Sequence, residues 1–139
     1  MSFCSSLDIV GSALTAERFR ADIITQNIAN AKTTVTSTGD PYRRQQSVFE
    51  EIPLTFKDEL NKARGGVRMS TVVESDRDFK LVYEPGHPQA DADGYVRYPN
   101  VDTTEEMIDL MAASNAYEAN LTALGVVKAM INKTLEMGK

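Results

Sequence analysis

The sequence offers few side chains able to act as nucleophiles, bases or metal ligands. His87, the sole histidine, lies in a Pro/Gly segment at residues 85–88 and has no cysteine or carboxylate partners at ligand spacing. We therefore interpret it as a structural loop residue. Cys4, the sole cysteine, is the only thiol available to pair with His87, and its place at the start of the chain argues against a catalytic pair.

The acidic segments match no catalytic or metal-binding pattern. Residues 91–94 (Asp-Ala-Asp-Gly) are similar to the core of a calcium loop, but an EF-hand aligned on Gly94 puts Asn100 where a bidentate glutamate belongs. We expect an acidic turn there. The carboxylate pairs at residues 50–51 and 58–59 lack a recognisable apolar pocket and are interpreted as solvated charges. The sequence thus predicts no enzyme activity, no cofactor, no metal and no small-molecule substrate.

Length and charge narrow the class of protein further. A chain of 139 residues suits one domain, and its net charge of −5 argues against nucleic acid as the main partner. Arg43 and Arg44 form too short a basic run for nucleic acid and better suit a subunit contact or an exposed strand face. No window approaches the roughly 18 apolar residues that span a bilayer, and the first residues lack the basic region of a cleaved signal peptide. We expect neither a membrane span nor signal cleavage.

The main predicted element is a long helix over residues 103–138. Thr103 with Glu106 three residues later predicts a capping box at its start, and Gly138 marks its end. Its apolar residues recur at alternating steps of three and four, the spacing of a coiled-coil seam. Seven of nine seam positions are apolar: Met107, Leu110, Ser114, Tyr117, Leu121, Leu124, Lys128, Ile131 and Leu135.

The first thirty residues predict a second helix with the same spacing. Ser5 or Ser6 can cap it, and only Glu17 interrupts its apolar seam. Seven of eight seam positions are apolar: Leu7, Val10, Leu14, Glu17, Ala21, Ile24, Ile28 and Ala31.

The C-terminal helix also carries a second stripe beside its seam. Small residues dominate this stripe, which consists of Ala112, Ala116, Ala119, Ala123, Val126 and Met130. We expect the two Leu/Ile-rich seams to pair with each other and the alanine stripe to pack on a neighbouring subunit. Two helices cannot cover this much apolar surface, which indicates a protein partner. The termini are hypothesised to stay disordered until they dock on neighbours.

Between the helices the pattern changes to short strands. Residues 33–41 are Thr-rich and end in a turn signal, and period-2 alternation follows at residues 67–73 and 79–83. We expect about four short strands, with loops at residues 58–66 and 85–93. Residues 56–64 are compatible with one or two helical turns instead.

The predicted fold class is mainly α with a small β insertion (α+β), in which the terminal helices pair as a coiled coil. Residues 1–32 and 101–139 form a discontinuous helical inner domain, 33–41 a linker and 42–100 a small β-rich outer region. We expect the insertion to lie at one end of the helix pair.

Several segments resemble a known family. Asn27, Ile28, Ala29, Asn30 and Thr33 match the S/T-x-N-I-A-N-x-x-T signature of flagellar rod, hook and hook-associated axial proteins. Further matching segments follow in the family's order, at residues 39–44 (GDPYRR), 83–88 (YEPGHP), 90–96 (ADADGYV), 99–102 (PNVD), 106–107 (EM) and 114–120 (SNAYEAN). Over its whole length the chain resembles the family of flagellar basal-body rod protein C, the proximal-rod subunits. Only the linker at residues 33–38 departs from the pattern.

The resemblance implies a structural, non-catalytic subunit that polymerises helically around the export channel of the bacterial flagellar basal body and transmits torque from motor to hook. It implies self-association and contacts with other flagellar rod proteins, the rod-base adaptor and the flagellar type III export apparatus. Export would occur unfolded, without a cleaved signal peptide. The helices would form the inner layer of the rod, where it crosses the periplasm or cell wall.

We expect the subunit interface to use the seams and the signature segment. Within that segment, the side chains of Asn27 and Asn30 are predicted to bond backbone groups where the helix ends and so fix how the chain leaves the inner layer. The expected interface residues are Leu7, Val10, Leu14, Ile24, Asn27, Ile28, Ala29, Asn30, Thr33, Met107, Leu110, Tyr117, Leu121, Leu124, Ile131 and Leu135.

Two alternatives stay open from the residues themselves. A cytoplasmic coiled-coil adaptor would form a small closed oligomer instead of a polymer. An enzyme with a site in the β region would depend on His87 or on a bound metal.

Overall fold

The computed structural model describes residues 3–52 and 65–138, and its elements follow the predicted order. Helix α1 (Phe3–Ala29) is followed by strands β1 (Gln45–Glu51), β2 (Val67–Glu74), β3 (Lys80–Tyr83) and β4 (Tyr95–Tyr98), and then by helix α3 (Thr103–Met137). Strands β1 and β2 form one antiparallel two-stranded sheet, and β3 and β4 form another. The prediction of a mainly α chain with a small β insertion is confirmed.

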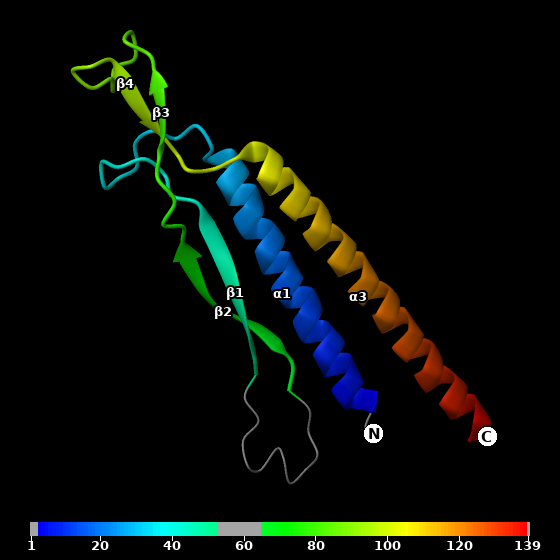
Figure 1. The fold of residues 1–139 in the computed structure, drawn as a ribbon. Helices are drawn as coiled ribbons and strands as arrows, with labels where there is room; N and C mark the ends of the chain where they lie inside the picture. The colour runs from blue at the N-terminus through cyan, green and yellow to red at the C-terminus, as the bar shows by residue number, and fades with distance from the viewer. Residues whose placement is uncertain (1–2, 53–64, 139) are drawn as a thin grey trace.

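The two helices form an antiparallel pair, so that both chain ends lie at the same end of the molecule (Figure 1). Helix α1 has 27 residues and α3 has 35, about 52 Å at roughly 1.5 Å per residue. Helix α1 lies between α3 and the β1–β2 hairpin (Figure 1). Its predicted seam faces away from solvent, since Ile24 is buried and Leu7, Val10, Leu14, Glu17, Ala21, Ile28 and Ala31 are half-buried.

Helix α3 meets α1 along a different face from the one expected. Ala113 is only 1% exposed, and Ala116, Asn120 and Val127 are half-buried. This contact face runs between the two predicted stripes. Of the expected seam, only Leu110, Leu124 and Ile131 are half-buried, whereas Met107, Ser114, Tyr117, Leu121, Lys128 and Leu135 are exposed.

The first turn of α3 determines which face of this helix is turned toward α1. Glu106 is fully buried, and Ala113, Asn120 and Val127 follow it at intervals of seven residues, nearly two helical turns each. Burial of Glu106 therefore turns these positions toward α1 and moves the Leu/Ile-rich seam to the rim. The expectation that this seam forms the centre of the helix pair was wrong. So was the assignment of every alanine to a neighbour, because Ala116 and Ala123 are half-buried.

The β insertion does not lie wholly at one end of the helix pair. The β3–β4 hairpin projects beyond the helices as expected, whereas β1–β2 runs alongside α1 (Figure 1). The Val67 N–H donates to Ser12 Oγ of α1 at 3.1 Å, and a Cβ on Gly66 would approach that oxygen to 2.5 Å. Close contact with α1 thus pulls this hairpin beside the helix. The loop expected at residues 58–66 and the helical turns at 56–64 fall largely on residues 53–64, outside those described.

The connections contain tight turns. In the linker, the Thr36 N–H donates to the Asp40 carbonyl at 2.9 Å, and Gly39 has a φ of +89° that favours glycine. The acidic segment forms the expected turn, in which Asp91 N–H donates to the Tyr95 carbonyl at 2.8 Å. No helix in the described part of the chain is long and apolar enough to cross a membrane.

Candidate functional site

A buried polar hub joins the end of α1, the start of β1 and the first turn of α3. We define it as Asn27, Tyr42, Arg44, Asn100 and Glu106. Asn27, 1% exposed, donates from Nδ2 to the Gln45 carbonyl at 2.8 Å and to Glu106 Oε2 at 2.9 Å. Its Oδ1 accepts from the Tyr42 hydroxyl and from the Gln45 N–H, each at 2.9 Å. All the hydrogen-bonding capacity of this amide is therefore used.

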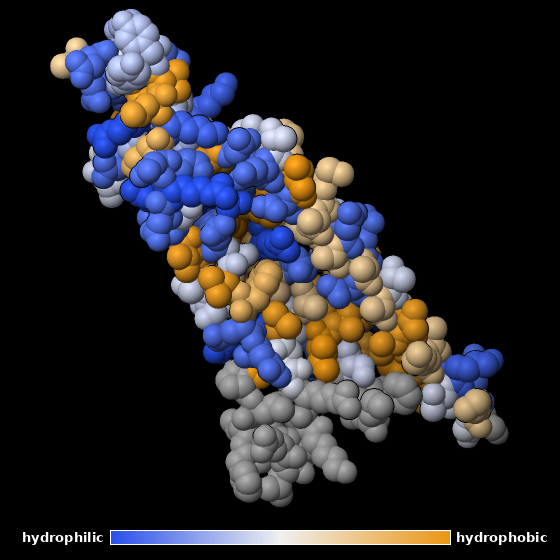
Figure 2. Space-filling view, in the orientation of Figure 1, coloured by the Kyte–Doolittle hydropathy of each residue, from blue (hydrophilic) through white to orange (hydrophobic). Residues whose placement is uncertain are grey.

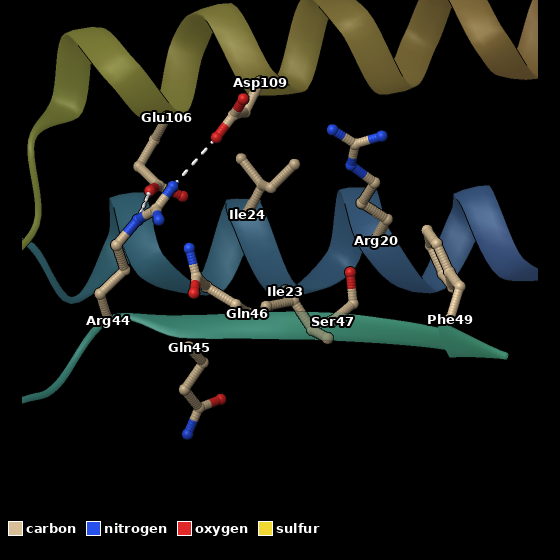
Figure 3. A pocket seen from close by; sticks show the side chains of 10 residues that line it. All are labelled: Arg20, Ile23, Ile24, Arg44, Gln45, Gln46, Ser47, Phe49, Glu106 and Asp109. Atoms are coloured by element: carbon tan, nitrogen blue, oxygen red, sulfur yellow. Dashed lines mark hydrogen bonds and ion pairs between the residues drawn. The ribbon is translucent and has the colours of Figure 1, made fainter. Parts of the chain in front are cut away.

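Arg44 binds α3 through two carboxylates. Its Nε donates to Glu106 Oε1, and its Nη2 donates to Asp109 Oδ2 at 3.0 Å. Arg44 is 7% exposed and Glu106 is 0% exposed, so this is a buried ion pair whose charges depend on each other. Figure 3 shows Arg44 reaching from the start of β1 to both carboxylates, past the side of α1. Arg44 was expected on an exposed strand face or in a subunit contact, and its burial contradicts that prediction.

Asn100 completes the hub from the segment before α3. Its Oδ1 accepts from the Arg44 N–H at 2.7 Å. Its Nδ2 donates to the carbonyls of Ser75 at 3.2 Å and Arg77 at 2.9 Å. The hub thereby holds the ends of both hairpins against the helix pair.

The surroundings of the hub shift two pKa values. Burial raises the pKa of the Tyr42 hydroxyl, and the negative charges of Glu106 and Glu74 raise it further. Burial opposes the charged form of Arg44, but the hydrogen bond and charge of Glu106, with Asp109 and Glu105, more than offset it and raise the pKa of Arg44. The hub is therefore built to keep Tyr42 neutral and Arg44 charged.

Glu106 does not form the predicted capping box with Thr103. The N-cap is Asp102, whose carboxylate accepts from the Thr104 N–H at 2.9 Å. That hydrogen bond, followed by the charge of Lys80, lowers the pKa of Asp102. The cap is thus one residue earlier than expected, which leaves Glu106 free to bind Arg44.

A pocket of about 250 Å³ lies beside the hub, between α1, β1 and α3. Arg20 and Ile24 of α1 point from it toward α3, and Phe49 of β1 closes one end (Figure 3). Among the described residues, no group of three or more His, Cys, Asp or Glu side chains is placed to hold a metal ion. His87 accepts from the Gln89 N–H at 3.2 Å within the β3–β4 turn, away from the hub.

The signature segment behaves as expected at the end of α1. Asn30 Nδ2 donates to the Gln26 carbonyl at 3.0 Å, and Asn30 Oδ1 accepts from the Thr33 hydroxyl at 3.2 Å. Asn27 instead reaches β1, eighteen residues further on. The prediction that both amides bond backbone groups is confirmed, with Asn27 acting over the longer range.

The second candidate site is the outer face of α3. Its large apolar side chains are exposed: Met107 57%, Ile108 64%, Met111 67%, Tyr117 39%, Leu121 51%, Val126 50%, Met130 55%, Leu135 67% and Met137 77%. Figure 2 shows hydrophobic side chains gathered over the two helices, whereas the end that carries β3 and β4 is mostly hydrophilic. A monomer seldom exposes so many large apolar residues on one element.

Sequence reasoning missed three members of the hub. None of Tyr42, Arg44 and Asn100 was predicted to take part in a buried polar network. Their partners are 15 to 65 residues away, and no periodic signal records such a distance. The local cue was a polar residue at each point where a regular element begins or ends.

Comparisons with known proteins agree with this architecture. The family model described as flagellar basal body rod FlgEFG protein C-terminal matches residues 92–137, which include β4 and all of α3. Flagellar basal-body rod protein FlgC of Salmonella typhimurium strain LT2 is 44% identical over 139 residues, with all of both chains covered. The protein of the same name from Bacillus subtilis strain 168 is 42% identical over 150 residues, again with both covered in full. The chain therefore belongs to the family of flagellar basal-body rod protein FlgC.

Proposed function

We propose that this chain is a structural subunit of the proximal rod of the bacterial flagellar basal body. The observation that carries this proposal is full-length identity above 40% to relatives named as basal-body rod proteins. The exposed apolar face of α3 supports it, because such a face is suited to permanent contact with other subunits.

The subunit would polymerise helically around the export channel and carry torque from motor to hook. The polar hub suits that role, since it ties both hairpins to the helix pair through buried, fully paired groups. Its partners would be copies of itself, other rod proteins and the rod-base adaptor. It would reach the rod through the flagellar type III export apparatus, without a cleaved signal peptide.

Within this function, we assign the expected interface residues two roles. The exposed members on α3, Met107, Tyr117, Leu121 and Leu135, would contact neighbouring subunits directly. The α1 members other than the exposed Ala29 are half-buried or buried, and they would support the inner layer by holding α1 against its neighbouring elements. Asn27 and Asn30 would act by fixing where the chain leaves α1.

Gene deletion and basal-body isolation test the proposal. Cells that lack the chain should stop swimming and lose the rod, and the restored chain should appear in isolated basal bodies. Swimming deletion cells, or a chain found only in the cytoplasm as a small closed oligomer, would support the adaptor alternative instead.

Helix formation is proposed to be completed by assembly. The C-terminal part of α3 from Asn132 onward is wholly exposed in the single subunit, so little burial there offsets the entropy of ordering. Circular dichroism of the free chain should show less helix than α1 and α3 together would give, and protease should trim α3. A fully helical, protease-resistant monomer would contradict this.

A further inference from the structure

Four of the six methionines of this chain lie on α3, and all four are exposed. The exposed fractions are 57% for Met107, 67% for Met111, 55% for Met130 and 77% for Met137. Methionine is among the residue types most often buried in folded proteins. In the single subunit these four thioether sulfurs are instead open to small molecules in the solvent.

The fold of the single subunit does not use these four side chains. The face of α3 that meets α1 contains Glu106, Ala113, Asn120 and Val127. No buried or half-buried residue of α3, which is described over its whole length, is a methionine. Changes at exposed positions away from such contacts alter stability little. A chemical change at the four sulfurs would therefore alter the surface of α3 and leave its contact with α1 intact.

Met69 is the one methionine of the described residues that lies outside α3. It stands on β2 opposite Phe49 of β1 and is half-buried. The susceptibility of a sulfur to oxidants follows its exposure, so Met69 should react more slowly than the four methionines of α3. It is therefore an internal reference for any reaction at those sulfurs.

Oxidation of a thioether changes the polarity of the surface that carries it. Hydrogen peroxide, a two-electron oxidant, transfers one oxygen to the sulfur. The S–O bond forms as the O–O bond breaks, and the proton of the transferred oxygen leaves with the other oxygen as water. The product is a sulfoxide, which is polar where the thioether was apolar. A sulfoxide oxygen pressed against an apolar surface has no hydrogen-bond donor, and burying it is unfavourable.

We propose that the four methionines of α3 are an oxidation site, at which a peroxide makes the single subunit unable to assemble while leaving it folded. Met107 and Met111 are one turn apart near the start of α3, and Met130 and Met137 are two turns apart near its end. Sulfoxides would thus lie at both ends of the exposed apolar face. This inference rests on the proposed function, in which other subunits cover that face.

Limited oxidation of the purified chain tests the site itself. A Cys4→Ser background removes the competing thiol, and each oxygen gained adds about 16 Da to a peptide. The peptides of α3 should gain oxygen from hydrogen peroxide before the peptide of Met69, and this order should disappear in urea. The chain oxidised on α3 should keep its circular dichroism spectrum and its midpoint of urea unfolding. Earlier oxidation of Met69, or loss of helix once α3 is oxidised, would overturn the proposal.

A matched pair of variants tests the effect on assembly. Met107 and Met111 are replaced together, by glutamine in one chain as a polar mimic of the sulfoxide and by leucine in the other as an apolar side chain of similar volume. Both chains should unfold at the wild-type urea concentration. In cells that lack the native chain, the leucine variant should restore swimming and appear in basal bodies. The glutamine variant should do neither.

The outcomes separate the oxidation site from the proposed function. Absence of the unsubstituted chain from basal bodies would contradict the proposed function. If the unsubstituted chain is present, normal rods with the glutamine variant would overturn the oxidation site and leave the proposed function standing. Loss of rods with the leucine variant as well would overturn it too, because the loss would then follow from side-chain shape and not from polarity.

Discussion

The polar hub and the outer face of α3 are opposites in composition and in exposure. The hub consists of amides, a hydroxyl and charged groups, and its members Asn27, Arg44 and Glu106 are 7% exposed or less. The outer face of α3 is mostly apolar, and its large side chains are between 39% and 77% exposed. In an ordinary monomer the buried side chains would be mostly apolar and the exposed ones mostly polar.

This difference separates what the single subunit completes from what it leaves open. Buried polar groups are stable only when each has its partner, and the hub supplies those partners within the chain. Exposed apolar groups gain stability only when another surface covers them. Substitutions in the hub should therefore act on folding, and substitutions on α3 should act on assembly.

The largest effect on folding is expected from Glu106→Ala. It leaves Arg44 charged and buried without its main partner, and breaking such a pair costs about 3–5 kcal/mol. Urea unfolding followed by circular dichroism measures this loss. Glu105→Ala is the control, because its pair with Arg77 is exposed at 51% and 60% of the two side chains and contributes less than about 1 kcal/mol. Equal losses in the two variants would contradict a special role for the hub.

Asn27→Ala should have the next largest effect. It leaves the Tyr42 hydroxyl, the Gln45 N–H and the Gln45 carbonyl without their partner, a loss of about 2–3 kcal/mol. Asn30→Ala removes bonds only within the end of α1 and its following turn and should cost about 1 kcal/mol. Swimming should fall more with the first variant than with the second. Wild-type stability and swimming with Asn27→Ala would refute this.

Sequence patterns predicted the elements of this chain better than their contacts. Spacing of apolar residues located both helices, and alternation located β2 and β3, because those signals are local. The face by which α3 meets α1 depends on Glu106, whose partner Arg44 is 62 residues earlier. The same Glu106 lies three residues after Thr103, so the local capping pattern assigned it to the wrong partner. Only the folded chain distinguishes the two roles.

Substitutions on the outer face of α3 should impair assembly while leaving the stability of the single subunit almost unchanged, the opposite of substitutions in the hub. Met107→Ser and Leu135→Ser alter side chains that are 57% and 67% exposed, so the free energy of unfolding should change by less than about 0.5 kcal/mol. Because these residues are proposed to contact neighbours, swimming and recovery of the chain in basal bodies should nonetheless fall. Lys133→Ser, also exposed on α3, is the control for an exposed position that is not apolar. Intact rods with both apolar variants would show that this face is not needed.

The smallest effect is a pH dependence that originates in the hub. Because the pKa of Tyr42 is raised above 10.0, the folded chain holds this proton at a pH where the unfolded chain has released it. The contribution of Tyr42 to stability is therefore complete below about pH 10 and is lost as pH rises through the folded pKa.

Tyr42→Phe removes the titrating group and the hydrogen bond to Asn27. The variant should be about 1 kcal/mol less stable than the wild type near neutral pH and should lose less stability than the wild type above pH ~10. Tyr98, whose pKa is also raised by a hydrogen bond to Glu84, lies outside the hub. The Tyr98→Phe variant therefore measures how much of the loss of stability at high pH comes from Tyr98. If Tyr42→Phe loses stability as steeply at high pH as the wild type, Tyr42 does not govern this pH dependence, and the hub stabilises the fold through the Arg44–Glu106 pair and the two asparagines alone.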